Sequence, residues 1–243
     1  MGHFAKEPES PSGPVPLTGV AKVPGQAPPG ASVWVFPPPD RPYSLVEGWE
    51  FGPVFEPFTI EGDGPRKFFL DDRFPDGPFL IEAAHRDGGH FSLRPLTERG
   101  EDIPDVWFNV LLQDFRGSTV PQRRYVQLNV SASNPWILRV KPVAAARLLT
   151  GTLTGYGHEA LLHTGPATDL HVRFKGGEPG RNGHVGLWCH EVGGETELGE
   201  ERRSLLLNEA RKAKCTVRLP EGPVLLRFNA EGRWTLTVEE PGS

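Results

Sequence analysis

The final strand-like stretch of the chain, FNAEGRWTLTV (Phe228–Val238), repeats a pattern found 98 residues earlier in VSASNPWILRV (Val130–Val140). Alternate residues of an extended strand lie on the same face, so the Trp, Leu and Val of each stretch share one side. We therefore predict that each stretch is the sealing strand of a β-sandwich, with its Trp in the core. The predicted core residues are Trp136, Leu138 and Val140 in the first copy, and Trp234, Leu236 and Val238 in the second.

The repeat extends beyond these closing strands. GHFSLRP (Gly89–Pro95) matches GHVGLWC (Gly183–Cys189), and RYVQLNV (Arg124–Val130) matches GPVLLRF (Gly222–Phe228). Two copies of one fold explain matches at this separation better than a solenoid of short units. The predicted divisions are an N-terminal arm at 1–44, one module at 45–143 and a second module at 144–243.

Short runs with alternating apolar and polar residues fill both halves, separated by Gly, Pro, Asp and Asn. Such spacing predicts an all-β chain of two antiparallel, jelly-roll-like sandwiches in tandem, preceded by an extended arm. One segment, SLLLNEARKAK (Ser204–Lys214), has the composition of a helix. Its counterpart in the first copy, VLLQDFRGSTV (Val110–Val120), favours strand, turn and strand, and we predict the same for both.

The N-terminal arm is rich in proline, with eleven prolines in residues 1–42, so little regular structure is expected there. Aromatic residues gather at its end and in the segment that follows. They either attach the arm to the first sandwich or bind a protein partner or a sister subunit. The candidate interface residues are Trp34, Phe36, Tyr43, Trp49 and Phe51.

The composition excludes several classes of partner. The 243 residues contain 26 basic and 31 acidic side chains, and none of the three predicted segments is strongly basic, which argues against nucleic acid. The chain has no apolar stretch typical of a signal peptide or a membrane-spanning helix. We therefore expect a cytoplasmic protein, or a component of a released particle. Cys189 and Cys215 are expected to be reduced thiols.

Catalytic motifs are scarce. Gly155–Ala160 matches GxGxxA, but its flanks predict strand and turn rather than the strand and helix of a dinucleotide site, so a Gly-rich turn is expected. No GxSxG nucleophile elbow or phosphate-binding GxxxxGK[ST] loop occurs in the sequence. We therefore expect no enzyme activity and no cofactor.

The sequence offers two alternative metal sites. Zinc would draw on His171, His184 and His190 if neighbouring strands present them on one face. Calcium would use loop carboxylates such as Asp71, Asp72 and Asp76, although their spacing matches no known calcium loop. His90 and His184 occupy the same place in the two copies, which indicates either a repeated binding site or a repeated structural contact.

The segment LLLNEARKAKCTVRLPEGPVLLRFNAEGRWTLTV (Leu205–Val238) resembles a recurrent bacterial β-sandwich module. The resemblance depends on the turn Leu219–Gly222 and on Ala230–Trp234, and it covers about the last 90 residues of the chain. Such modules are similar to the jelly-roll sandwiches of carbohydrate-binding and pre-peptidase-type appendages. The resemblance implies a jelly roll, and most such modules have no known activity. Saccharide binding follows from it only by analogy of fold.

Three functions follow as hypotheses. The first is a non-catalytic interaction or assembly protein that docks through its arm on a protein partner or a sister subunit. The second is a pair of carbohydrate-binding modules, and the third is a metal-dependent enzyme that uses the histidines of the second module.

Overall fold

The computed structural model describes residues 45–46, 49–85, 89–103, 107–111, 115–121, 125–176, 183–192 and 203–239. All of them belong to one compact unit, Pro38–Ser243. The predicted arm at 1–44 lies outside the described residues.

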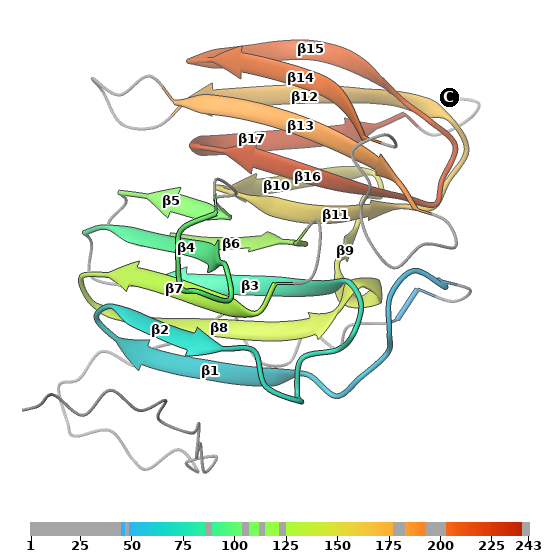
Figure 1. The fold of residues 1–243 in the computed structure, drawn as a ribbon. Helices are drawn as coiled ribbons and strands as arrows, with labels where there is room; N and C mark the ends of the chain where they lie inside the picture. Colours follow the sequence, from blue (N-terminus) through green and yellow to red (C-terminus); the bar gives the residue numbers. More distant parts are fainter. Residues whose placement is uncertain are drawn as a thin grey trace, which may run out of the picture. The chain divides into compact units, whose positions relative to one another are not determined.

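The first part of this unit forms eight strands in two four-stranded sheets (Figure 1). One sheet has the order β1-β8-β3-β6 and the other the order β2-β7-β4-β5. Neighbouring strands are antiparallel throughout. The strands are β1 (Phe58–Asp63), β2 (Arg66–Phe69), β3 (Phe79–His85), β4 (Phe91–Leu96), β5 (Phe108–Val110), β6 (Phe115–Thr119), β7 (Gln127–Ala132) and β8 (Pro135–Pro142).

The second part contributes a four-stranded sheet, β10-β17-β12-β15, and a five-stranded sheet, β14-β13-β16-β11-β9. A short 3-10 turn, η1 (Val143–Ala145), connects it to the first part. Only the short pair β9–β11 is parallel among the described strands. The strands are β9 (Arg147–Leu148), β10 (Thr152–Tyr156), β11 (Glu159–His163), β12 (Thr168–Gly176), β13 (His184–Glu191), β14 (Arg203–Ala210), β15 (Lys212–Leu219), β16 (Val224–Ala230) and β17 (Gly232–Val238).

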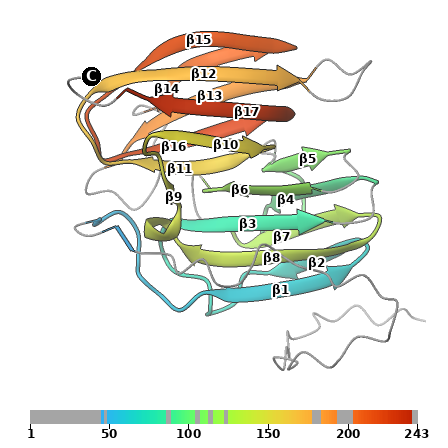
Figure 2. The same cartoon turned by 180° about the vertical axis from the view of Figure 1, so that it is seen from behind.

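Both parts have the strand order of an eight-stranded jelly roll. The sheets β1-β8-β3-β6 and β2-β7-β4-β5 recur as β10-β17-β12-β15 and β11-β16-β13-β14, with β9 added at one edge (Figures 1 and 2). The predicted all-β fold of two tandem sandwiches is therefore confirmed. The segment 204–214 is strand, turn and strand as predicted, with Arg211 in the left-handed region at the turn. No helix in the described ranges is long and apolar enough to cross a membrane.

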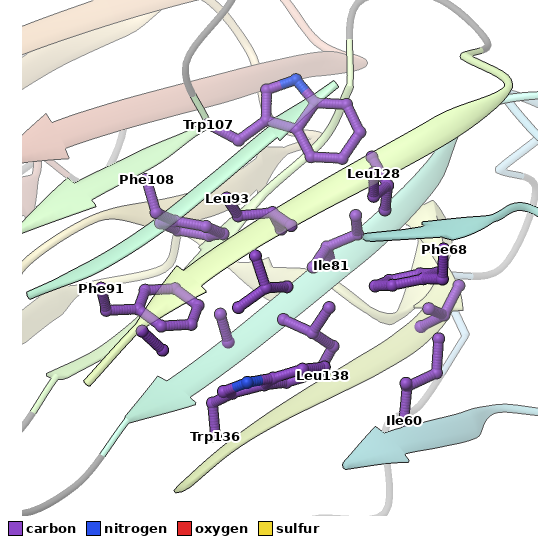
Figure 3. Packing of buried hydrophobic residues seen from close by; sticks show 14 of the residues in the cluster. Ile60, Phe68, Ile81, Phe91, Leu93, Trp107, Phe108, Leu128, Trp136 and Leu138 are labelled. Carbon is purple, nitrogen blue, oxygen red and sulfur yellow. The ribbon is translucent and has the colours of Figure 1, made fainter. Parts of the chain in front are cut away.

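Each sandwich encloses its own apolar core. Trp136 is 1% exposed and Trp234 is 2% exposed, so both indoles lie inside. Figure 3 shows Trp136 and Leu138 among the packed side chains of the first core. Val140 and Leu236 are also buried, whereas Val238 is half-buried against the edge of the second core.

A glycine makes room for each tryptophan. Gly62 lies opposite Trp136 in the β1–β8 pair, and Gly155 lies opposite Trp234 in the β10–β17 pair. A Cβ atom at either glycine would overlap the indole ring. Two residues further on, the carbonyl oxygens of Gly64 and Gly157 accept the indole N–H at 2.8 and 2.9 Å. The GxG motif of Gly155–Gly157 therefore provides the space and the hydrogen-bond acceptor for a tryptophan. The same motif recurs at Gly62–Gly64.

Gly64 and Gly157 have left-handed backbones, with φ of 72° and 82°. Glycine adopts this conformation without the steric penalty that a side chain brings. The turn at each position aims the carbonyl oxygen at the indole. The repeated tryptophan is thus fixed by a repeated pair of glycines, one for space and one for backbone direction.

A third apolar cluster joins the two sandwiches, and we call it the junction cluster. Strand β6, at the edge of its sheet, also meets the second sandwich directly. The Ser118 N–H donates to the carbonyl oxygen of His158 at 3.1 Å, and the Ala160 N–H donates to Ser118 Oγ at 2.9 Å. The junction cluster consists of Phe51, Leu80, Val120, Val143, Ala146, Ala160, Leu162 and Leu225.

Two of the predicted interface aromatics lie at this junction. Phe51 is 5% exposed within the junction cluster, and the Trp49 ring packs against the cluster. The Trp49 Nε1–H donates to the carbonyl oxygen of Phe51 at 2.7 Å, and the two rings meet edge to face. The prediction that Phe51 offers its ring to a partner is wrong, because the ring is buried by the chain itself.

Candidate functional site

A pocket of about 290 Å³ opens where the two sandwiches meet. Residues of β13, β14 and β16 form one side of it, and the start of β5 forms the other. Its wall combines indole rings with amide, imidazole and carboxylate groups. The lining residues are Trp107, Asn109, His158, His184, Gly186, Trp188, Leu205, Asn208, Asn229 and Glu231.

Strand alternation explains why β13 supplies three of these residues. Val185, Leu187 and Cys189 point into the second core. The residues between and before them, His184, Gly186 and Trp188, therefore face outward. The pocket is thus formed on the outer surface of a sheet whose inner surface is fully occupied.

Trp188 has a defined ring position. The Arg203 guanidinium lies over its ring, 4.4 Å from the centroid, and such a cation–π contact is attractive. Gly186 leaves space beside the ring, because a Cβ atom there would be 3.7 Å from Trp188 Nε1 and 3.5 Å from His184 Cε1. Trp188 stays partly accessible, so the indole can present an apolar surface to a ligand.

The polar groups of the pocket are arranged in pairs. His184 Nε2 lies 2.6 Å from Asn208 Oδ1, and His158 Nδ1 lies 3.4 Å from Asn229 Oδ1. An amide oxygen only accepts hydrogen bonds, so each of these ring nitrogens carries the proton. Burial lowers the pKa of His158 to about 4, against the opposing hydrogen bond to Asn229. His158 is therefore neutral near pH 7, and its other ring nitrogen is an acceptor.

The repeated histidine makes the same contact in both copies. His90 Nε2 lies 3.3 Å from Asn109 Oδ1, as His184 does from Asn208. The strand register makes the two asparagines equivalent, since Asn109 lies opposite Ser92 and Asn208 lies opposite Gly186. The contact is a repeated structural link between adjacent strands, and both asparagines also line the pocket.

The predicted zinc ligands do not come together. His171 projects from β12 on the outer side of one sheet, and His184 and His190 project from β13 on the outer side of the opposite sheet. A zinc site requires neighbouring strands to present the three on one face, but the core of the second sandwich separates His171 from the other two. Among the described residues, no group of three or more His, Cys, Asp or Glu side chains is arranged to hold a metal ion.

Each of these histidines has another environment. His171 lies between Thr216 Oγ1, at 2.8 Å, and Glu239 Oε1, at 2.5 Å. His190 is 1% exposed and makes no hydrogen bond through its ring nitrogens. Burial, with smaller effects from Arg227 and Arg203, lowers the pKa of His190 to about 3.

Other predicted site residues fall outside the pocket. Asp71 is engaged by Arg73 through short hydrogen bonds, which lower the pKa of the carboxyl group. Cys189 is buried and Cys215 is half-buried, and both are free thiols. Trp34, Phe36 and Tyr43 lie outside the described residues, so the predicted docking of the arm on a partner stays a prediction.

Sequence reasoning missed most of the pocket. The sequence does not single out Trp107, Trp188 or the three asparagines, because the alternation around them is that of an ordinary strand and Trp107 lies just before β5. One signal was present: the His at the repeated position is followed, 19 and 24 residues later, by an Asn on the adjacent strand.

No family model and no curated protein matches this chain. Among solved structures, the chain is similar to the tandem domain CBM22-1–CBM22-2 of Xyn10C from Paenibacillus barcinonensis, at 7% sequence identity. The match covers 71% of this chain and 81% of that chain, with a TM-score of 0.24. The jelly-roll assignment rests on the strand order of the chain itself.

Proposed function

We propose that this chain is a non-catalytic binding protein and that its pocket takes a saccharide. The observation that carries the proposal is the wall of the pocket, where the Trp188 indole stands among asparagine and histidine side chains. A sugar ring has an apolar face and a rim of hydroxyl groups. An indole suits the face, and groups that both donate and accept hydrogen bonds suit the rim.

The size of the pocket favours a small ligand. A volume of about 290 Å³ is near the lower end of the range for small-molecule sites. The ligand that fits is one or two sugar units, or the end of a longer chain. Trp188 is already partly buried and its ring is held by Arg203, so binding orders little that was free before.

The number of carboxyl groups in the pocket favours saccharide binding over saccharide cleavage. Glu231 is the one acidic residue among those that line the pocket. Most glycoside hydrolases use two carboxyl groups on either side of the scissile bond. His158 and Asn229 already hold one another, which suits recognition of hydroxyl groups.

Gly186 offers a direct test. A side chain there meets no atom closer than 3.5 Å at its Cβ, so Gly186→Val fills the pocket while the strand remains intact. The protein is first screened on a glycan array, and its best ligand is titrated by calorimetry. We expect Gly186→Val and Trp188→Ala each to weaken binding by at least about tenfold, or about 1.4 kcal/mol.

Thr59→Val is the matched control, since Thr59 is exposed on the outer face of β1, away from the pocket. It should leave the affinity unchanged. The absence of any saccharide ligand on the array, or equal binding by Gly186→Val and the wild type, would refute the proposal.

A further inference from the structure

The outer face of the sheet β10-β17-β12-β15 carries five basic side chains that the pocket does not use. On β12, β15 and β17 the residues beside them, Phe174, Ala213 and Trp234, belong to the second core. The five side chains therefore point away from the core. We call this surface the basic face. It consists of Arg173, Lys175, Lys212, Lys214 and Arg233.

The strand register places these charges against one another. Lys175 lies opposite Lys212 on one side and opposite Arg233 on the other. Arg173 lies opposite Lys214 in the adjacent row. Directly opposite residues have Cβ atoms about 5 Å apart, and like charges in such pairs destabilise a sheet. The arrangement is unfavourable for the fold by itself.

No acidic side chain among the described residues pairs with these cations. Within the described residues, none of the five basic side chains makes a hydrogen bond or an ion pair. Two carboxylates at the opposite end of the same sheet are already engaged. Asp169 accepts from Arg218 at 3.0 Å, and Glu239 pairs with His171.

The first sandwich is an internal comparison, because it has the same fold. In its equivalent sheet Arg116 stands in the place of Lys214, and Glu82 forms an ion pair with Lys141 at 2.7 Å. The jelly roll does not require a cation at the positions of Arg173 and Arg233. By strand register, Ala84 stands in the place of Arg173, Pro135 in that of Arg233 and Asp63 in that of Tyr156.

We infer that the basic face binds an acidic polysaccharide, whose carboxylate or sulfate groups neutralise the two rows of cations. Strands are about 4.8 Å apart, so a polymer laid across them meets three neighbouring cations in the first row and two in the second. Thr154 and Thr235 continue the second row with hydroxyl groups, and the half-exposed Tyr156 ends the first.

The surroundings select a saccharide among polyanions. A site for single-stranded nucleic acid uses several aromatic platforms for its bases, whereas Tyr156 is the one aromatic in these two rows. A membrane-binding surface adds apolar side chains that insert into lipid. A protein interface has an apolar centre. Cations bordered by threonine hydroxyls suit a charged, hydroxyl-rich chain, and the choice of a saccharide also rests on the proposed function.

The test uses the full chain and a galacturonic acid hexasaccharide, with a heparin hexasaccharide as the sulfated probe. We expect binding that weakens as sodium chloride rises from about 0.05 M to about 0.5 M, because salt screens exposed charges. The double variant Lys175→Gln, Arg233→Gln should bind either probe about tenfold more weakly, as two exposed ion contacts are lost. Its melting temperature should equal or exceed that of the wild type, because like-charge repulsion is removed.

The matched control removes two cations from the first sandwich, Arg66→Gln with Lys67→Gln, and should keep the full affinity. Equal loss in this control would overturn the inference, as would tighter binding to single-stranded DNA or phosphatidylserine vesicles at equal charge. Gly186→Val separates the two proposals. If neutral saccharides fail to bind while the acidic probes bind through the basic face, the pocket proposal fails and this one stands. If the acidic probes do not bind, this inference fails whatever the pocket does.

Discussion

Replacing Gly155 by alanine tests whether the absence of a side chain at this position is needed to accommodate Trp234. An alanine Cβ would stand 2.5 Å from Trp234 Cη2 and 2.6 Å from Cε2, against an ordinary contact of 3.4 Å or more. Trp234 Cζ2 is closer still, so the indole has to move by more than about an ångström. It is 2% exposed and surrounded by close-packed neighbours, so this movement also strains its hydrogen bond to Gly157.

The expected loss of stability follows from these two effects. Overpacking a core costs about 1–3 kcal/mol, and a strained or lost hydrogen bond adds about 1 kcal/mol. The lower flexibility of the unfolded alanine chain returns about 0.4–1 kcal/mol. We expect Gly155→Ala to lower the free energy of unfolding by about 2–3 kcal/mol.

A double-mutant cycle with Trp234→Phe isolates the clash. The smaller ring removes the atoms that the new Cβ meets, so the double variant should be more stable than the sum of the single effects by about 1–2 kcal/mol. Urea unfolding, followed by circular dichroism and tryptophan fluorescence, gives the four free energies. Strict additivity would refute the reasoning.

The first sandwich provides a replicate and the pocket provides a control. Gly62→Ala should destabilise by an amount within about 1 kcal/mol of Gly155→Ala, because Trp136 has the same seat. Gly186→Ala, whose Cβ has only ordinary contacts, should change stability by less than about 0.5 kcal/mol.

Two further predictions concern pH. The pKa of His190 is lowered to about 3 by burial, so only the unfolded chain gains a proton as pH falls below 6.5, and stability is lost from there down towards pH 3. His190→Leu should lose less stability than the wild type between about pH 7.5 and about pH 5 in calorimetry, and an equal loss would contradict this. The pKa of Glu159 is raised by burial, so the unfolded chain releases its proton first and stability falls as pH rises above 4.5. The urea midpoint of Glu159→Gln should equal that of the wild type at about pH 4 and be higher at about pH 7. A lower midpoint at both pH values would show that the attraction of Arg116 and Arg147 for the carboxylate outweighs the effect of burial.

The sequence allowed the jelly-roll fold to be predicted because its signals are local. Alternation in WILRV and WTLTV places Trp136 and Trp234 on the apolar side of their strands, and the structure has both inside. The segment 204–214 has helix-forming residues, yet its counterpart in the first copy indicated two strands. The sequence predicts a turn at the GxG of Gly155. It does not predict the contact of this glycine with Trp234, because the two lie 79 residues apart in the chain.

The candidate sites depend on information that is not local. The pocket needs Trp107 of one sandwich and Trp188 of the other, so it exists only once the two are placed. The cations of the basic face come from three strands, β12, β15 and β17. A count of charges along the chain does not reveal them, because it also includes acidic residues that lie on other surfaces. The zinc prediction failed for the same reason, since His171 and His184 are close in sequence but belong to opposite sheets.

The contact of β6 with the second sandwich has a consequence for self-association. A strand at the edge of a sheet leaves N–H and C=O groups ready to pair with another molecule, which is a common route to aggregation. Here the second copy covers that edge, through the bonds of Ser118 to His158 and Ala160. Loss of the second copy would reopen β6 to self-association. The second sandwich therefore shields the β6 edge whether or not the protein binds a ligand.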